Sequence, residues 1–184
     1  IDRSIRPSFP KSFRNEINVI CTVLSYDKDC HLDMLALIAA SAALAISDAP
    51  VEATVAGIRV GSINGEYVIN PSNEELVNSD LDLVIAGDKN SVYMVESEAK
   101  EASEEKMLEA LDFAHTSIQP VIEMIEDLKG KVGKDKLEVV VNDNQDLINE
   151  IKEKFLSEIE SSYSIKEKQE RTKSLKNLKE KIST

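Results

Sequence analysis

Four acidic side chains fall within one short stretch of this sequence. Asp82 sits in the apolar run 81–87, and Glu96, Glu98 and Glu101 lie just past the expected end of the next strand. Carboxylates gathered beside a strand are the usual protein ligands of Mg²⁺ or Mn²⁺. The same side chains can also be structural, either capping backbone groups or pairing with an arginine, and we expect this second role here.

A basic segment at the start of the chain carries the other candidates, Arg3 and Arg6. Residues 1–14 hold a net charge of +3, whereas the rest of the chain carries −15. A guanidinium matches phosphate geometry with two parallel hydrogen bonds, and Pro7 and Pro10 are expected to hold the segment extended. We therefore expect Arg3 and Arg6 to contact the phosphate groups of a polyanion. They could equally pair with acidic residues of this chain or of a neighbouring subunit.

The remaining side chains that could take part in catalysis or binding have simpler interpretations. His115 lies on a mostly apolar helical pattern, where a single histidine is more often a satisfied core or interface residue than a catalyst. His31 sits in a turn and is given no role. Ser41, inside an alanine-rich helix, is expected to bond back to a helix carbonyl. Cys21 and Cys30 lack the spacing of zinc ligands, and we expect two reduced thiols.

Composition narrows the class of protein. At 184 residues the chain can hold one large domain, or one domain with an appendage, and its hydrophobic fraction of 42% suffices for a core. The net charge of −12 argues against a binder that uses its whole surface for nucleic acid. No apolar run approaches the ~20 residues of a membrane span, and no signal peptide is visible. Because the chain starts at Ile1, we expect it to be a piece of a longer protein.

The first part of the chain alternates strand and helix patterns. Residues 17–26 are rich in β-branched side chains and predict a strand, and 32–47 predict a buried helix. Asn64-Gly65 is a strong hairpin signal, and a second hairpin turn is expected at 87–90. Residues 71–75 indicate a turn that leads into a short helix. Further strands are expected at 53–61, 66–70, 81–87 and 91–96.

A long helical pattern follows, with Ser103 as its N-cap and Gly130 as its end. Pro120 lies inside it and predicts a kink or a short break. Residues 138–141 could form a short strand or an extended linker. Two amphipathic helices rich in lysine and glutamate are then expected at 143–162 and 165–182. Most of their charge is expected to be solvated.

Several ordered motifs together resemble bacterial polynucleotide phosphorylase. The resemblance is to the later part of its first RNase PH-like core, followed by its all-helical linker domain, and it spans the whole chain. It is most specific over 1–111 and loosest after Gly130. The motifs lie at 1–10, 15–16, 40–44, 59–61, 67–71, 81–87 and 94–99.

The resemblance implies a fold and a parent activity. The expected fold class is α+β, with a partial RNase PH-like core at 1–135 (a mixed sheet with packed helices) and a truncated helical linker domain at 136–184. Enzymes of this family degrade RNA from its 3′ end with phosphate, release nucleoside diphosphates, and form ring-shaped homotrimers. The parent is thus expected to be a polyribonucleotide nucleotidyltransferase.

The family pattern also implies that this piece is not the catalytic core. Family active sites use a serine-rich phosphate loop at the start of the core helix, together with acidic residues and a lysine around the strand that matches 81–87. Here the helix opens at 31–34 without a serine pair, and only Asp82 matches an acidic position. Leu76 and Val84 occupy the positions of its acidic partner and the lysine. We expect no catalytic residue and no metal site in this chain.

Cofactors and partners follow from the same resemblance. Mg²⁺ or Mn²⁺ and inorganic phosphate are expected in the second core of the parent, and none in this chain. Expected partners are RNA, the other subunits of a homotrimer and proteins of an RNA-degradation complex, with no membrane and no DNA, in the cytoplasm. Two alternatives remain: a structural oligomerisation module without RNA contact, and a subunit of a single-core RNase PH-type exonuclease. The helical C-terminal segment argues against the latter.

Overall fold

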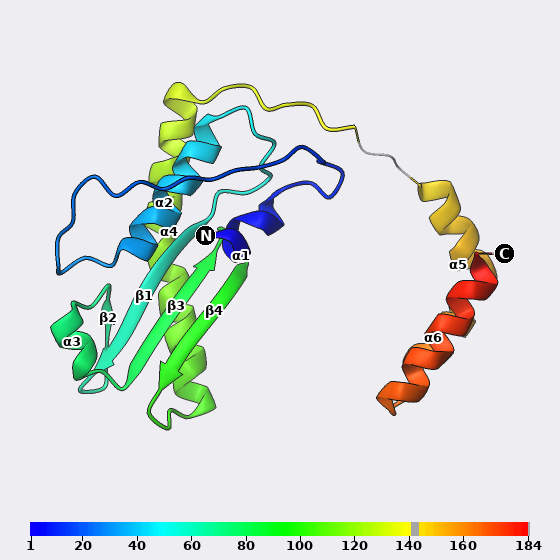
Figure 1. The fold of residues 1–184 in the computed structure, drawn as a ribbon. Coiled ribbons are helices and arrows are strands. Elements are labelled where there is room, and N and C mark those ends of the chain that lie inside the picture. Colours follow the sequence, from blue (N-terminus) through cyan, green and yellow to red (C-terminus); the bar gives the residue numbers. More distant parts are fainter. Residues whose placement is uncertain (141–143, 184) are drawn as a thin grey trace. The chain divides into compact units, whose positions relative to one another are not determined.

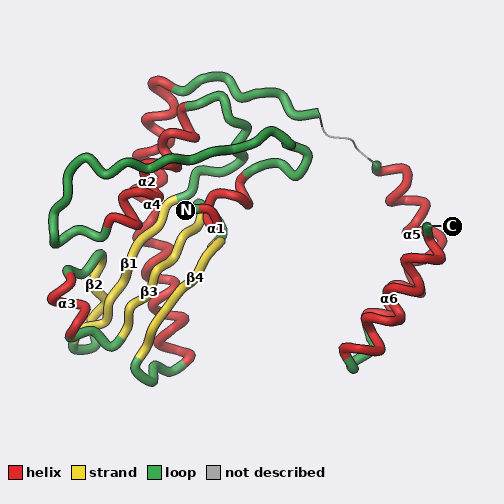
Figure 2. Tube along the Cα trace, viewed as in Figure 1, coloured by secondary structure: helices red, strands yellow, loops and turns green. Residues whose placement is uncertain are grey.

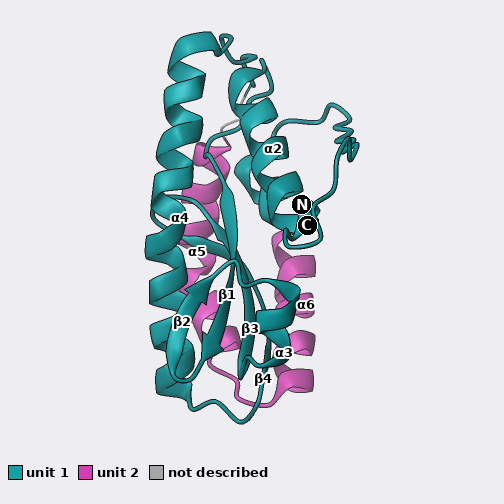
Figure 3. Cartoon of the chain, turned by 90° about the vertical axis from the view of Figure 1, so that its left-hand side faces the viewer, with its two compact units in different colours: residues 1–140 teal, residues 141–184 magenta. Residues whose placement is uncertain are grey.

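A computed structural model describes residues 1–140 and 144–183. The chain divides into two compact units, residues 1–140 and residues 141–184, which Figure 3 shows in two colours. Each unit is described by itself. Within the described residues, no helix is both long and apolar enough to cross a membrane.

The first unit has an α+β fold, which confirms the expected fold class (Figure 1). A short N-terminal helix and a 3₁₀ turn precede a long loop, a core helix, a four-stranded sheet and a second long helix. In chain order the elements are α1 (Asp2–Ile5), η1 (Arg6–Ser8), α2 (Leu32–Ile46), β1 (Ala56–Ile63), β2 (Glu66–Ile69), α3 (Asn73–Val77), β3 (Leu81–Gly87), β4 (Val92–Ala99) and α4 (Glu104–Val132).

The four strands lie in the order β2-β1-β3-β4, and all neighbouring pairs are antiparallel. The expected mixed sheet is therefore not found among the described strands: β2 and β4 each return beside their predecessor, and β3 lies antiparallel beside β1. The hairpin at Asn64-Gly65 is confirmed, with φ of 53° and 85° at its two residues. These left-handed values are those of a turn that matches the twist of the strands.

One face of the sheet packs against α4. Ile58 on β1 and Leu83 and Ile85 on β3 point to this face and are almost completely buried, together with Ala114 and Ile118 of the helix. Side chains of a strand alternate between its faces, so the residues between them point away from α4. The sheet thus has an apolar face and an opposite face that is free to carry polar groups.

Helix α4 begins as expected, because the Ser103 hydroxyl accepts a hydrogen bond from the N–H of Lys106. Of the kink or short break expected at Pro120, the break is not formed, since the helix runs without interruption to Val132. Packing of Ile118 and Ile122 on either side of the proline against the sheet outweighs the one hydrogen bond that proline cannot donate. The helix also continues past its expected end at Gly130.

Helix α2 lies close against β1 at Gly57. A Cβ at this position would stand 2.5 Å from Leu37 Cδ2, so a larger residue would force the buried Leu37 side chain to shift. The Ser41 hydroxyl accepts a hydrogen bond from the N–H of Val55 at 3.1 Å, which corrects its expected bond to a helix carbonyl. The ammonium of Lys136 donates to three carbonyl oxygens at the C-terminal end of the helix, those of Leu44, Ala45 and Ser47.

The strand expected at 17–26 is not formed. Figure 2 shows a long loop between α1 and α2 in its place, and the described sheet holds no strand from this segment. Ile20 and Leu24 are 79% and 93% exposed. A strand requires the backbone of a neighbour, and this segment has none among the described residues. Cys21 and Cys30 in this loop are free and exposed.

The N-terminal segment also differs from its expected extended form. Residues 2–5 are α-helical and Arg6–Ser8 form a 3₁₀ turn with Pro7 in its first positions. The fixed φ of proline suits the first turn of a helix as well as an extended chain, so Pro7 did not exclude this outcome.

The second unit is a pair of helices, α5 (Gln145–Tyr163) and α6 (Lys168–Ile182), as expected. They contact each other through a hydrogen bond between Ser162 and Ser174 and an ion pair of 2.7 Å between Lys181 and Glu158. The start of the first helix was expected at Asp143, which lies outside the described residues. The strand or linker expected at 138–141 has no strand at 138–140, and Val141 is also outside them.

Asp88 organises the hairpin between β3 and β4. Its carboxylate accepts hydrogen bonds from the N–H groups of Asn90 and Ser91 and from the Tyr93 hydroxyl, at 2.6–2.8 Å. Burial alone would raise the pKa of Asp88, but these hydrogen bonds and nearby His115 together lower it. Burial and the bond to Asp88 raise the pKa of Tyr93 to about 12.

Because its pKa is lowered in the folded state, Asp88 stabilises the fold above its ordinary titration range, and this contribution is lost as the pH falls through the lowered value. Asp88→Asn should therefore cost about 1–2 kcal/mol at pH 7 and flatten the acid side of the stability profile. Urea unfolding of the variant and of exposed-site Asp112→Asn, from pH 7 to pH 3, checks this. Equal acid dependence in both variants would contradict it.

Candidate functional site

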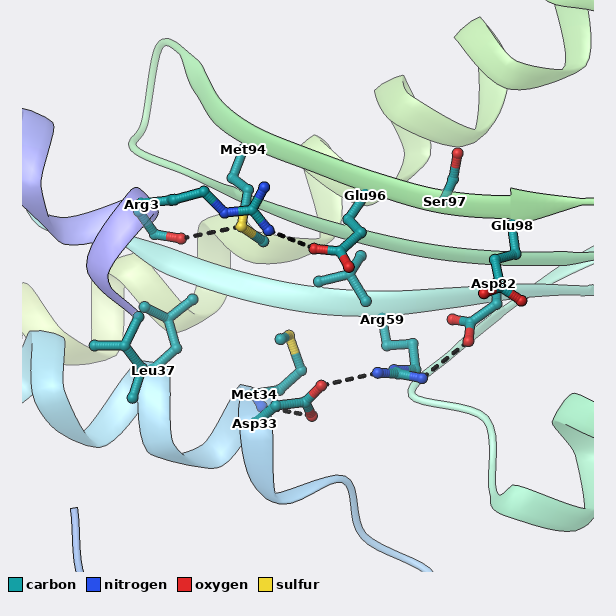
Figure 4. A pocket seen from close by; sticks show the side chains of 13 residues that line it. Arg3, Asp33, Met34, Leu37, Arg59, Asp82, Met94, Glu96, Ser97 and Glu98 are labelled. Carbon is teal, nitrogen blue, oxygen red and sulfur yellow. Dashed lines mark hydrogen bonds and ion pairs between the residues drawn. The ribbon is translucent and has the colours of Figure 1, made fainter.

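A cleft of about 450 Å³ lies on the face of the sheet that is turned away from α4. Antiparallel pairing sets Arg59 of β1 beside Val84 of β3, which in turn faces Glu96 of β4. Asp82 and Glu98 form the next matched pair on the same face. Figure 4 shows Arg59, Asp82, Glu96 and Glu98 with the start of α2 opposite them. The strand alternation that buries Leu83 therefore also gathers the polar groups.

Arg59 is the centre of this cleft. Its guanidinium donates to Asp82 Oδ2 at 2.9 Å and to Asp33 Oδ2 at 2.8 Å. The arginine side chain is only 17% exposed, whereas those of Asp33 and Asp82 are 48% and 36% exposed. One cation thus joins the first turn of α2 to the middle of the sheet and balances two carboxylates.

Two polar atoms of this bridge remain without a partner. Arg59 Nε and Asp82 Oδ1 are buried and form no hydrogen bond with the described residues. The bridge is therefore held through only part of its hydrogen-bonding capacity. The structural role that we expected for Asp82, pairing with an arginine, is what the structure shows.

The other acidic candidates occupy different positions from those expected. Glu96 and Glu98 lie within β4 and not past its end, because the strand pairs with β3 as far as Ala99. Glu101 follows the strand in a left-handed conformation, with φ of 53°, and does not line the cleft. Among residues 1–140 and 144–183, no group of three or more His, Cys, Asp or Glu side chains is arranged to hold a metal ion.

The two predicted phosphate-binding arginines both have acidic partners. Arg3 Nη2 lies 2.5 Å from Glu96 Oε2, and Arg6 Nη2 lies 2.7 Å from Asp2 Oδ1. The arginine side chains are 69% and 77% exposed. Exposed pairs of this kind contribute roughly 0–1 kcal/mol, so a phosphate could exchange with either carboxylate. Arg3 lines the cleft around Arg59, and Arg6 does not.

The two histidines are held by backbone carbonyls. His115 Nε2 lies 3.0 Å from the carbonyl oxygen of Asp88, which agrees with a satisfied structural histidine. His31 Nε2 lies 2.7 Å from the carbonyl oxygen of Pro71 and stands at the N-cap position of α2. Neither histidine lines the cleft.

Part of the helix start that the family pattern associates with a phosphorolytic site does come together with Asp82 here. Asp33 and Met34 of α2 line the same cleft as Asp82 and Val84 of β3. Leu76 lies on α3 and does not line it. Asp33 and Arg59 were not predicted from the sequence as residues of this site. The alternation along β1 placed Arg59 opposite the apolar face, but its partners are distant in sequence.

Comparisons with known proteins place the chain in a family. The sequence model of the 3′ exoribonuclease family, domain 1, matches residues 1–50, and that of domain 2 matches residues 53–117. The two matches together cover more than half of the chain. The chain therefore belongs to the 3′ exoribonuclease family.

Individual relatives give a narrower match within this family. Polyribonucleotide nucleotidyltransferase of Rickettsia canadensis (strain McKiel) is 51% identical over all 184 residues, and that of Rickettsia massiliae (strain Mtu5) is 50% identical. The chain spans 25% of the length of each. The resemblance to this enzyme, also called polynucleotide phosphorylase, is thus confirmed along the whole chain.

A solved structure supports the fold. The crystal structure of Rrp46 from rice (Oryza sativa) matches 57% of this chain and 51% of its own, with a TM-score of 0.51 and 16% sequence identity. At that identity the likeness concerns the fold alone.

If Arg59 holds the sheet to α2, removing its charge leaves Asp82 partly buried without a partner. Arg59→Met should cost about 1–3 kcal/mol of stability, and adding Asp82→Asn should recover part of that loss. Lys131→Met is the control, since it breaks an exposed ion pair with Asp127 in the same unit. Urea unfolding measures all three. A loss for Arg59→Met no larger than that for Lys131→Met would refute the bridge.

Proposed function

We propose that this chain is part of a phosphate-dependent 3′-to-5′ exoribonuclease, a polyribonucleotide nucleotidyltransferase. The parent would attack the 3′-terminal phosphodiester of RNA with inorganic phosphate and release nucleoside diphosphates. The observation that carries the proposal is identity of about half over all 184 residues to enzymes of that name.

Within the parent, the chain would be the non-catalytic first RNase PH-like core at 1–135, followed by the helical linker domain from 136. The support comes from the cleft. A phosphorolytic site needs phosphate donors and a metal-holding carboxylate pair together. Here Asp82 is neutralised by Arg59, and Val84 stands where the family places a lysine. Mg²⁺ or Mn²⁺ and phosphate would bind in the second core of the parent.

The role of this core would be assembly and RNA guidance. The basic segment 1–14 stands out against an acidic chain, and the guanidinium groups of Arg3 and Arg6 are exposed. We propose that both arginines leave their acidic partners for RNA phosphates. The other proposed partners are the subunits of a homotrimer and proteins of an RNA-degradation complex, in the cytoplasm. The rival function is an oligomerisation module that makes no RNA contact.

One measurement distinguishes RNA guidance from an oligomerisation module without RNA contact. Arg3→Ala with Arg6→Ala should weaken binding of single-stranded RNA at low salt and lower the slope of log K against log salt by about 1.4, since each lost phosphate contact contributes about 0.7. Fluorescence anisotropy at several salt concentrations measures both quantities.

The matched control is Lys129→Ala with Lys131→Ala, which also removes two cations that are paired with carboxylates. It should leave affinity and slope unchanged. Unchanged RNA binding in the Arg3 and Arg6 variant would favour the oligomerisation module.

A further inference from the structure

A second groove of about 1010 Å³ lies along the N-terminal segment and shares only Ile1 with the cleft around Arg59 among their lining residues. We call it the aromatic groove. Its walls come from residues 1–19, and it is lined by apolar side chains, by two phenylalanines and by three cations. The lining residues used below are Arg6, Phe9, Lys11, Phe13 and Arg14.

The two phenylalanines form a stack that the surrounding structure holds in place. The rings of Phe9 and Phe13 are nearly parallel, with centroids 5.9 Å apart and an interplanar angle of 16°. Phe9 packs on the buried cluster that includes Ile5 and Leu37, so its ring is fixed by the core. A hydrogen bond of 3.0 Å from the N–H of Phe13 to the carbonyl of Pro10 closes the turn between the rings. The position of Phe13 is therefore set by the backbone as well as by its neighbour.

The charge around the stack is positive. Arg6, Lys11 and Arg14 line the groove against one acidic side chain, Asp2, which is paired with Arg6. This concentration of cations lies in a chain whose net charge is −12. A flat ring stack bordered by cations suits a ligand that carries both a planar π-system and phosphates.

Single-stranded nucleic acid combines those two properties along its whole length. Every base offers a face for stacking, and the phosphates follow a basic groove. In a duplex the bases are already stacked inside, and their faces are not available to a side chain. The groove therefore favours a single strand over a duplex.

We propose that the aromatic groove binds single-stranded RNA, with a base stacked on the Phe9–Phe13 pair and the adjoining phosphates held by Lys11 and Arg14. This inference rests on the proposed function and deepens it, because it adds a base-contacting site to the phosphate contacts of Arg3 and Arg6. It gives the basic segment a preference for unpaired strands.

The test titrates the 184-residue chain into a labelled oligoadenylate, first single-stranded and then annealed to its complement. The single strand should bind more tightly. Phe13→Leu keeps an apolar side chain but removes the ring, and it should weaken binding about fivefold to a hundredfold without changing the salt slope. Phe13→Tyr keeps the ring and should bind as the natural chain does. Circular dichroism shows whether each variant is folded.

A charge variant separates stacking from phosphate contacts. Lys11→Ala with Arg14→Ala should lower the salt slope by about 1.4, whereas Lys89→Ala with Lys106→Ala, elsewhere in the same unit, should not. Tyr26→Leu removes an aromatic side chain that is 58% exposed in the loop and should have no effect.

Three outcomes would overturn the inference: unchanged affinity in Phe13→Leu, equal affinity for the duplex, or a dimer of the chain that dissociates in Phe13→Leu, which would assign the groove to a second copy. The first outcome combined with weakened binding in the Arg3 and Arg6 variant would leave the proposed function standing. Loss of binding in Phe13→Leu alone would support the groove and count against the proposed arginine contacts.

Discussion

The alternation of side chains along β1 and β3 is the constraint on which the rest of this fold depends. One set of positions, including Ile58 and Leu83, is buried against α4 and forms the core. The other set, including Arg59 and Asp82, must face the opposite side. A shift of register by one residue would exchange the two sets, placing a guanidinium in the apolar core and isoleucine in the cleft. Core and cleft are therefore determined together.

The ion bridge on the second face adds to the apolar contacts of Met34 and Leu37 in orienting the N-terminal end of α2. Gly57 lets the helix approach β1 closely, Asp33 reaches Arg59, and Lys136 binds the carbonyls at the opposite end. A phosphorolytic copy of this fold would need the same place for phosphate and metal. Here the guanidinium of Arg59 lies beside Asp82, and this contact supports the proposed non-catalytic role.

Sequence signals that depend on neighbouring residues predicted much of this fold. Features that depend on residues distant in the sequence were not predicted. The turn at Asn64-Gly65 and the cap at Ser103 depend on neighbouring residues and were predicted correctly. The strand at 17–26 depends on a partner backbone that local sequence cannot supply. Pro120 indicated a break because its local cost is plain, whereas the packing that holds α4 together is tertiary.

The candidate site also depends on contacts between residues that are distant in the sequence. The role of Asp82 was anticipated in kind, but its partner Arg59 lies 23 residues away in sequence and Asp33 lies 26 residues from that arginine. Only the strand register brings them together. Arg3 and Arg6 were found from local charge, and their acidic partners Glu96 and Asp2 emerged only with the structure.

The central claim is that Asp82 serves as the partner of Arg59 and not as a metal ligand. Titration of the chain with Mn²⁺, followed by electron paramagnetic resonance, tests it directly. We predict that any bound Mn²⁺ is weak and is the same in the natural chain and in Asp82→Asn. A tight Mn²⁺ site that disappears in Asp82→Asn would contradict the account and make this core a candidate catalytic one.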